Sequence, residues 1–542
     1  MIENYEEFTE KQIEILKQFV TSTDSNIFVL RNLPEVIKGA LFSRYSRSTL
    51  GLRSLLLKDF ILNEETNFDH IAAAPSDHDD QMMAIQKAQN FYDRILDGYG
   101  DDSIGELGGA HLAVENVSML AAKEIEDGRI GGSPLEKSTR YIYFDQKMNG
   151  EFMYYREPVL MTSAFRDLYT QTCDRLYEAY GELIPPLTEM IEKTFPKAHD
   201  VSKVAYTAAL RAKVLDCLRG LLPASALTNM GVFGNGRFFE ALIKKSQCHN
   251  LSEMQDIGKK SFSELSKVIP SFVRRSDPNH KNQIDHVDFV EAFSSDVVDA
   301  VAEHCPSIGQ MEKAGVKLIH CDADGPVNVA AAMLFEKSNC SLASLRKYCA
   351  ELPEEELSKI LEIAAVHRKN RRHKSPRALE HATFTFEISA DYGIYRDLQR
   401  HRILTQEKQK LTCDYGYYTP RDIEGTELEP KYHEAMALAK KAYDLIAGEF
   451  PEEAQYVVPM AYNIKWYFHL NLRALQWICE LRSAPAGHPG YRFVAQEMAR
   501  QACEAMPEFE RMFKFVDYEG HDLGRLGQEI RKEAKTKAKQ EV

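Results

Sequence analysis

The sequence lacks the cysteine spacing of a disulfide scaffold or a zinc site. Its ten cysteines are scattered, without a CxxC pair or a paired Cys/His spacing, which indicates reduced, mostly buried thiols in a cytoplasmic protein. It also lacks an apolar run of the ~20 residues that a membrane-spanning helix requires. Its first residues are acidic and amphipathic, unlike a signal sequence. We therefore expect a cytoplasmic protein that has no membrane partner.

An excess of positive charge is missing as well. The 542 residues carry a formal net charge of -14, which argues against a general binder of nucleic acid or of anionic membranes. A local group of cations could still bind a small phosphate. The hydrophobic content of 44% is enough for a sizeable core, and this chain length favours two or three domains.

The chain contains two similar blocks. One begins at Ser103 and the other at Ser375, 272 residues later. Each passes from a short alternating segment (HLAVENV and ATFTFEI) to a helical pattern and then to a polar loop. Because alternation with a period of two predicts a half-buried strand, we expect a strand, a helix and a loop in each block.

A second pair of matching strings follows the blocks. The string P-x11-N-x-R begins at Pro223 and again at Pro459, 236 residues later. Two strings in the same order behind two similar blocks indicate a tandem duplication. We expect a first half over residues 1–305, with an insertion around 145–205, and a second half over residues 306–542 with a charged C-terminal tail.

The second block contains the triplet Arg400-His401-Arg402. Without its context, an RHR triplet at a helix end is usually a solvated cationic C-terminus that interacts with the helix dipole. In the same way, Glu136 and Arg140 of the first block could form a surface i,i+4 pair. Local sequence leaves these interpretations open.

Taken with the preceding EHATFTFEI and the following P-x11-N-x-R, the triplet makes each half resemble a subunit of the flavin-dependent thymidylate synthases, from about residue 26 to 515. The resemblance implies methylation of dUMP to dTMP with methylenetetrahydrofolate, while FAD carries reducing equivalents from NADPH. It also implies an α/β (α+β) fold of two similar lobes packed as an intrachain pseudo-dimer. Two such chains would form a homodimer that mimics the family's tetramer.

Neither half carries the family signature, an RHR followed by E-x-S-x-R, in full. The second half keeps the RHR but has Lys410 and Thr412 at the positions of the serine and the last arginine. The first half has Gly-Arg-Ile at 128–130 in the RHR register but keeps EKSTRY at 136–141. The halves have lost opposite parts, which indicates one whole site built from both.

The same complementarity extends to two further arginines. Arg219 stands four residues before the first proline anchor, where the second half has Gln455. Arg482 follows the second N-x-R by nine residues, where the first half has Ser246. In the family, the first of these arginines contacts the nucleotide and the second faces the uracil ring.

The resemblance thus assigns two sets of residues. The nucleotide would be bound by Glu136, Ser138, Thr139, Arg140, Arg219, Arg400 and Arg482. FAD would be bound by Ser375, Arg400, His401, Arg402, Asn471 and Arg473. Arg482 is the expected catalytic residue, because a fixed guanidinium at the ring edge stabilises the charge that develops as uracil C5 becomes nucleophilic. No metal is expected.

Two alternatives stay open. A degenerate relative that binds a nucleotide or a flavin without turnover, in a regulatory or scaffolding role, would also show losses in both halves. The same chemistry could instead act on another pyrimidine nucleotide, because one side chain at the ring edge can shift the acceptor. The basic loop HRKNRRHKSPR from His367 could contact nucleic acid, although a phosphate-facing or solvated loop fits an acidic chain better.

Overall fold

The computed structural model describes residues 7–46, 48–61, 105–128, 130–305 and 314–540. The chain divides into two compact units. The first unit comprises residues 1–115, 124–136 and 229–308. The second comprises residues 116–123, 137–228 and 309–542. Part of the predicted first half therefore belongs to the same compact unit as nearly all of the second half.

The first unit contains a three-stranded sheet in the order β1-β5-β2, in which β2 pairs antiparallel with β5. Its strands are β1 (Gly109–Ser118), β2 (Gly132–Glu136) and β5 (Leu227–Asn235). The helices in this part of the chain are α1 (Glu10–Phe19), α2 (Glu35–Tyr45), α3 (Leu52–Leu55), the π-helix η1 (Leu56–Ile61), α6 (Met119–Glu126), α10 (Gly236–Gln247), α11 (Ser252–Leu265), α12 (Pro270–Val273), the 3₁₀ helix η4 (Arg274–Ser276) and α13 (Lys281–His304).

The second unit is built on a four-stranded antiparallel sheet in the order β6-β7-β9-β8. Its strands are β6 (Gly315–Cys321), β7 (Thr383–Asp391), β8 (Thr405–Lys408) and β9 (Asn463–Asn471). Alternate side chains of β7, including Phe384, Phe386 and Ile388, are fully buried. The alternating segment ATFTFEI is therefore a half-buried strand, as predicted.

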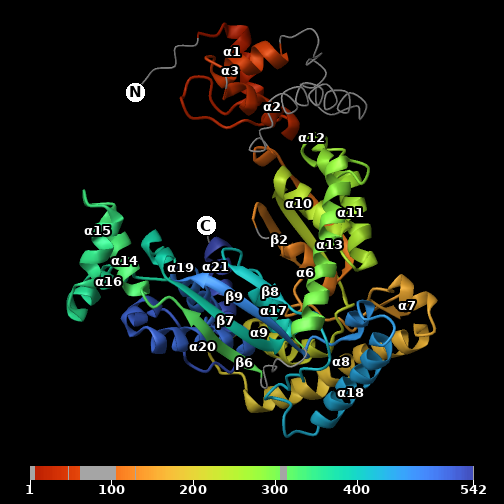
Figure 1. Ribbon diagram of the computed structural model, residues 1–542. Helices are drawn as coiled ribbons and strands as arrows, with labels where there is room; N and C mark the ends of the chain where they lie inside the picture. Colours follow the sequence, from red (N-terminus) through yellow and green to blue (C-terminus); the bar gives the residue numbers. More distant parts are fainter. Residues whose placement is uncertain (1–6, 47, 62–104, 129, 306–313, 541–542) are drawn as a thin grey trace. The chain divides into compact units, whose positions relative to one another are not determined.

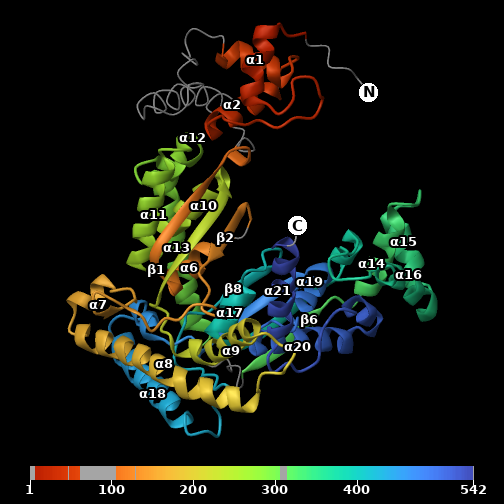
Figure 2. The ribbon, with the colours of Figure 1, turned by 180° about the vertical axis from the view of Figure 1, so that it is seen from behind.

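Helices surround this sheet (Figures 1 and 2). The predicted insertion folds into the hairpin of β3 (Lys147–Met148) and β4 (Glu151–Phe152) and into the long α8, which packs against α9 and α18. The helices are α7 (Pro158–Thr162), α8 (Arg166–Thr194), α9 (Lys203–Leu218), η3 (Arg219–Leu221), α14 (Gly325–Phe335), α15 (Leu342–Ala350), α16 (Glu354–Val366), η5 (Arg377–His381), α17 (Tyr392–Leu398), α18 (Glu429–Ala447), η6 (Glu453–Val457), α19 (Leu472–Arg482), α20 (Pro489–Ala505), η7 (Pro507–Phe513) and α21 (Leu526–Gln540). Within the described ranges, no helix combines the length and the apolar character needed to cross a bilayer.

The two halves repeat the same order of elements. In each predicted block a strand runs directly into a helix, β1 into α6 and β7 into α17. Later, β5 runs into α10 and β9 into α19, and the matching Asn235 and Asn471 cap these helices by accepting from the backbone N–H three residues on, at 2.9 Å in each case. The strand order β1-β5-β2 in one sheet corresponds to β7-β9-β8 in the other. The architecture is therefore a mixed one of helices and sheets, as expected.

Equivalent residues of the two halves also contact each other within the second unit. The proline anchors Pro223 and Pro459 face each other in an isolated antiparallel bridge. The N–H of Ala224 donates to the carbonyl of Val458 at 2.8 Å, and the N–H of Met460 donates to the carbonyl of Leu222 at 2.9 Å. In each bond, the residue after one proline donates to the residue before the other proline. The local contact is therefore two-fold symmetric.

The cap at α19 generates a stability prediction. Replacing Asn471 with alanine removes the acceptor for the N–H of Ala474, and we expect the free energy of unfolding to fall by about 1 kcal/mol. Urea unfolding followed by circular dichroism measures the change. Asn471→Ser is the matched control, because serine caps a helix about as well as asparagine. Equal unfolding midpoints for the alanine and serine variants would contradict the prediction.

Candidate functional site

The EKSTRY loop that follows β2 places Arg140 in a buried network. Its Nε and NH2 groups donate to the two carboxylate oxygens of Asp216 on α9, at 2.6 and 2.7 Å. Its NH1 donates to the hydroxyl of Tyr491 on α20 at 3.1 Å, and NH2 also donates to the carbonyl of Ala486 at 3.3 Å. Burial would raise the pKa of Asp216, but the Arg140 guanidinium outweighs burial and keeps that pKa below its ordinary value. A residue of the first half is thereby fixed against residues of the second.

Arg219 makes a second connection between the halves. It begins η3, is 4% exposed, and its NH1 donates to Oδ2 of Asp397 at 2.9 Å. Asp397 lies in the last turn of α17, three residues before Arg400, and every residue of that helix is buried. Burial acts to raise the pKa of Asp397, but four guanidinium groups, those of Arg219, Arg400, Arg140 and Arg482, together hold it far below its ordinary value.

His401 and Arg482 are joined directly. Nε of Arg482, at the end of α19, donates to Nε2 of His401 at 2.8 Å. Burial and the neighbouring Arg482 charge lower the pKa of His401 well below its ordinary value. The imidazole is therefore neutral and accepts with Nε2, which leaves the proton on Nδ1. Arg400 and Arg402 on either side of it are exposed. The triplet is therefore not a simple solvated helix end, since its histidine is buried.

Tyr491 connects these pairs. Its ring centroid is 5.7 Å from Cζ of Arg140 and 5.5 Å from Cζ of Arg482, so the two guanidinium groups share one aromatic ring. We call Arg140, Arg219, Arg400 and Arg482 the arginine cluster. Two of its members come from the first half and two from the second, and all lie in the second unit.

The remaining predicted nucleotide residues lie on the same loop as Arg140. Ser138 is half-buried, and its Oγ accepts from the N–H of Arg140 at 3.3 Å. Thr139 is buried beside it. Glu136 is also buried, but it ends β2 and belongs to the first unit. The structure thus brings Ser138 and Thr139 next to the arginine cluster through their chain neighbour Arg140.

The predicted flavin residues form a separate group around the start of α19. Nε of Arg473 donates to the carbonyl of Ser375 at 3.0 Å, and NH1 pairs with Glu380 at 2.7 Å. The Ser375 hydroxyl donates to Oε1 of Gln476 at 2.6 Å. The side-chain oxygen of Asn471 accepts the hydrogen bond that caps α19. Hydrogen bonds within this part of the chain therefore fix Ser375, Asn471 and Arg473. His401, in contrast, contacts the arginine cluster.

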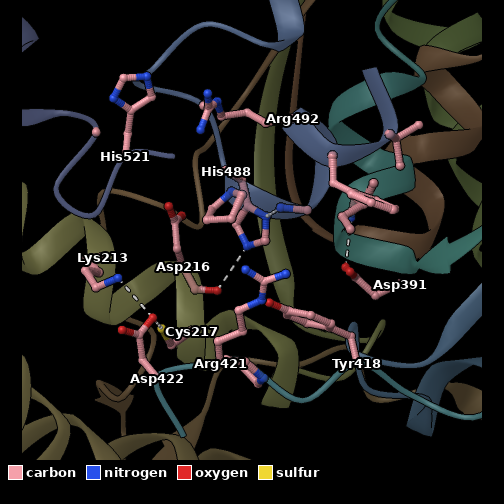
Figure 3. A pocket seen from close by; sticks show the side chains of 18 of the residues that line it. Lys213, Asp216, Cys217, Asp391, Tyr418, Arg421, Asp422, His488, Arg492 and His521 are labelled. Carbon is pink, nitrogen blue, oxygen red and sulfur yellow. Dashed lines mark hydrogen bonds and ion pairs between the residues drawn. The ribbon is translucent and has the colours of Figure 1, made fainter. Parts of the chain in front are cut away.

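A cavity of about 800 Å³ opens beside Arg140, with residues of α9, the ends of β7 and β9, and the loops around 420, 488 and 521 in its wall (Figure 3). Nε2 of His488 lies 3.2 Å from the carbonyl of Asp216. Burial and the nearby Arg219 lower the pKa of His488 to about 3. Burial raises the pKa of Asp391 to about 7, although Arg219 opposes the rise. Between these two pKa values, the wall of the cavity is largely uncharged at these two positions.

Several residues of this site were missed by sequence reasoning. Asp216 and Asp397 neutralise part of the charge of the arginine cluster, and Tyr491 and His488 lie beside it. None of these four residues belongs to a sequence motif. One signal was available: His488 and Tyr491 lie in SAPAGHPGYRFVA, the segment that directly follows Arg482. Tyr491 of this segment packs against the guanidinium group of Arg482.

The reciprocal positions in the second half are occupied differently. Lys410, which corresponds to Ser138, forms an ion pair with Glu452. Oε1 of Gln455, which corresponds to Arg219, accepts from the backbone N–H of Leu411 at 3.2 Å. The backbone N–H of this loop is therefore already hydrogen-bonded to a side chain of the protein, that of Gln455. Arg129, from the first half's RHR register, lies outside the described residues.

Comparison with known proteins identifies relatives of full and of partial length. A UPF0159 protein of Chlamydia muridarum (strain MoPn / Nigg) is 54% identical over 98% of this chain and 100% of its own. A UPF0159 protein of Thermoplasma acidophilum is 31% identical over 92% of this chain and 99% of its own. A flavin-dependent thymidylate synthase of Clostridium tetani is 28% identical over 37% of this chain and 85% of its own. The family model described as thymidylate synthase complementing protein matches residues 63–271 and again 317–508, so the chain belongs to that family.

Proposed function

We propose that this protein methylates C5 of a pyrimidine nucleotide, most simply dUMP to dTMP, at one site formed by the arginine cluster. The main support for the proposal is that the family residues kept in the first half lie close to those kept in the second half. Arg140 and Arg219 from the first half and Arg400 and Arg482 from the second act on a single carboxylate, that of Asp397. Relatives named flavin-dependent thymidylate synthases support the reaction class.

The residues divide the work between the two ends of the nucleotide. Arg219 is the principal phosphate ligand, because its NH2 is buried and makes no hydrogen bond to any described residue. Ser138 and Thr139 add hydroxyl and backbone donors to the same phosphate. Arg482 polarises the uracil edge, and its bond to neutral His401 fixes the orientation of the guanidinium plane.

The positive charge near Ser375 suits the negatively charged pyrophosphate of a flavin dinucleotide. Lys369, Arg372 and Lys374 are exposed on the loop that leads to Ser375, so the loop offers cations for a pyrophosphate. Arg473 holds the end of this loop through the Ser375 carbonyl. In the proposal, Ser375, Arg402, Asn471 and Arg473 hold FAD, which supplies hydride chemistry when bound. Methylenetetrahydrofolate and NADPH are the co-substrates that the same proposal requires.

The second, reciprocal nucleotide position is not a site in this proposal. Its loop donor is already bonded to Gln455, and its lysine is neutralised by Glu452. A phosphate would have to displace both interactions and would gain no guanidinium in return. We infer one nucleotide site per chain, formed where halves 1–305 and 306–542 meet as a pseudo-dimer. The exchanged hydrogen bonds around Pro223 and Pro459 support that arrangement.

The first prediction concerns where the site is completed. Arg140→Ala and Arg400→Ala should each lower dTMP formation about 100-fold or more, because each removes a positive charge that the proposed site uses to hold the nucleotide. Because both arginines belong to one chain's site, co-expressing the two variants should restore nothing. Co-expression of either variant with the wild type is the control and should keep about half of the activity. Recovery in the double-variant mixture would place the site between chains.

The second prediction concerns ligand linkage. The visible spectrum of the full chain with FAD should show bound flavin, and dUMP should shift it. Arg482→Ala should weaken the dUMP response about 100-fold, whereas Arg211→Ala, on the exposed side of α9, should not. A bound flavin that ignores dUMP would indicate a different acceptor. A chain that binds dUMP but no flavin would instead support the non-catalytic alternative.

A further inference from the structure

The arginine cluster contains its own anion. Asp397 is 9% exposed and stands in the last turn of a helix whose seven residues are all buried. Its Oδ2 takes the NH1 donor of Arg219 at 2.9 Å, although Arg219 is the arginine best placed for a phosphate. A carboxylate in this position competes with any anionic ligand for the same guanidinium.

Several hydrogen-bond donors of the cluster are already engaged. All three nitrogens of Arg140 are engaged, with Asp216, Tyr491 and the Ala486 carbonyl. Nε of Arg482 is engaged with His401. The NH2 of Arg219 is left as a buried donor without a hydrogen-bond partner among the described residues. The cluster therefore offers positive charge together with one buried donor, the NH2 of Arg219, that a phosphate oxygen could take.

The charges lead to the same conclusion. Four guanidinium groups and the carboxylates of Asp216 and Asp397 leave two net positive charges, while burial keeps His401 and His488 neutral. Asp391, which also faces Arg219, adds negative charge only above about pH 7. A nucleoside monophosphate carries about -1.5 to -2 at neutral pH and so matches this balance. A diphosphate carries about one further negative charge and does not.

We propose that Asp397 is a specificity-determining residue that restricts the site to nucleoside monophosphates, by holding one donor of Arg219 and by cancelling one of the cluster's positive charges. The inference rests on the proposed function, because it concerns the nucleotide of that same site. The alternative is that Asp397 serves only to position Arg219. The two readings differ in what happens when the charge is removed and the shape is kept.

Asp397→Asn provides that change, because an amide oxygen can still accept from NH1 of Arg219. Calorimetric titration of the full chain with dUMP, dUDP and deoxyuridine measures the effect without depending on turnover. The wild type should bind dUMP at least about tenfold more tightly than dUDP. The variant should gain affinity for dUDP and reduce that ratio roughly tenfold, since a like charge no longer faces the second phosphate. Deoxyuridine, which has no phosphate, should bind both proteins equally.

Two further variants complete the experiment. Asp397→Glu keeps the charge and should keep the preference for dUMP. Glu189→Gln removes one negative charge from the exposed surface of α8 and should leave the ratio unchanged. If Asp397→Asn weakens dUMP and dUDP equally, Asp397 is only a positioning residue and the inference is wrong. If its ratio stays at the wild-type value, the inference is also wrong, while the proposed function stands. A wild-type chain that binds none of the three ligands overturns the proposed function and the inference together.

Discussion

Guanidinium groups that are gathered in one place repel one another, and the structure around them must supply fixed counter-charges. In this protein the bidentate pair of Arg140 with Asp216 and the pair of Arg219 with Asp397 meet that requirement. Each pair also ties a first-half segment to a fixed partner: the EKSTRY loop to α9, and η3 to the buried α17. Without these carboxylates, the buried Arg140 and Arg219 would lack counter-charges, and the second-half arginines of the cluster would lose their fixed first-half neighbours.

The fold supplies the rigid supports for these pairs. Strands β7 and β9 pair along their whole length, and each ends at a capped helix, so α17 and α19 start from fixed points. Asp397 and Arg482 are carried by those two helices. Tyr491 lies at the start of α20, in the segment that follows Arg482. This segment also forms part of the cavity wall beside Arg140.

The local elements could be predicted from the sequence, but the pairs could not. Strand β7 followed from alternation, α17 from the helical pattern after it, and membership of the family from the RHR and the P-x11-N-x-R strings. Arg140, Arg219 and Arg482 were singled out by register. Their partners lie far away in the chain: Tyr491 is 351 positions from Arg140, and Asp397 is 178 positions from Arg219. Such contacts depend on tertiary packing, and an aspartate in a helix carries no local mark of its distant arginine.

The reciprocal hydrogen bonds around Pro223 and Pro459 bear on how the protein is made. Synthesis releases the chain from its N-terminus, and the segment that contains Pro223 is complete more than two hundred residues before its partner emerges. During that interval Arg140 and Arg219 have no partner at Tyr491 or Asp397, and closing so long a loop is entropically costly. These contacts between the halves therefore form only after the second half has been synthesised, late in the folding of the chain.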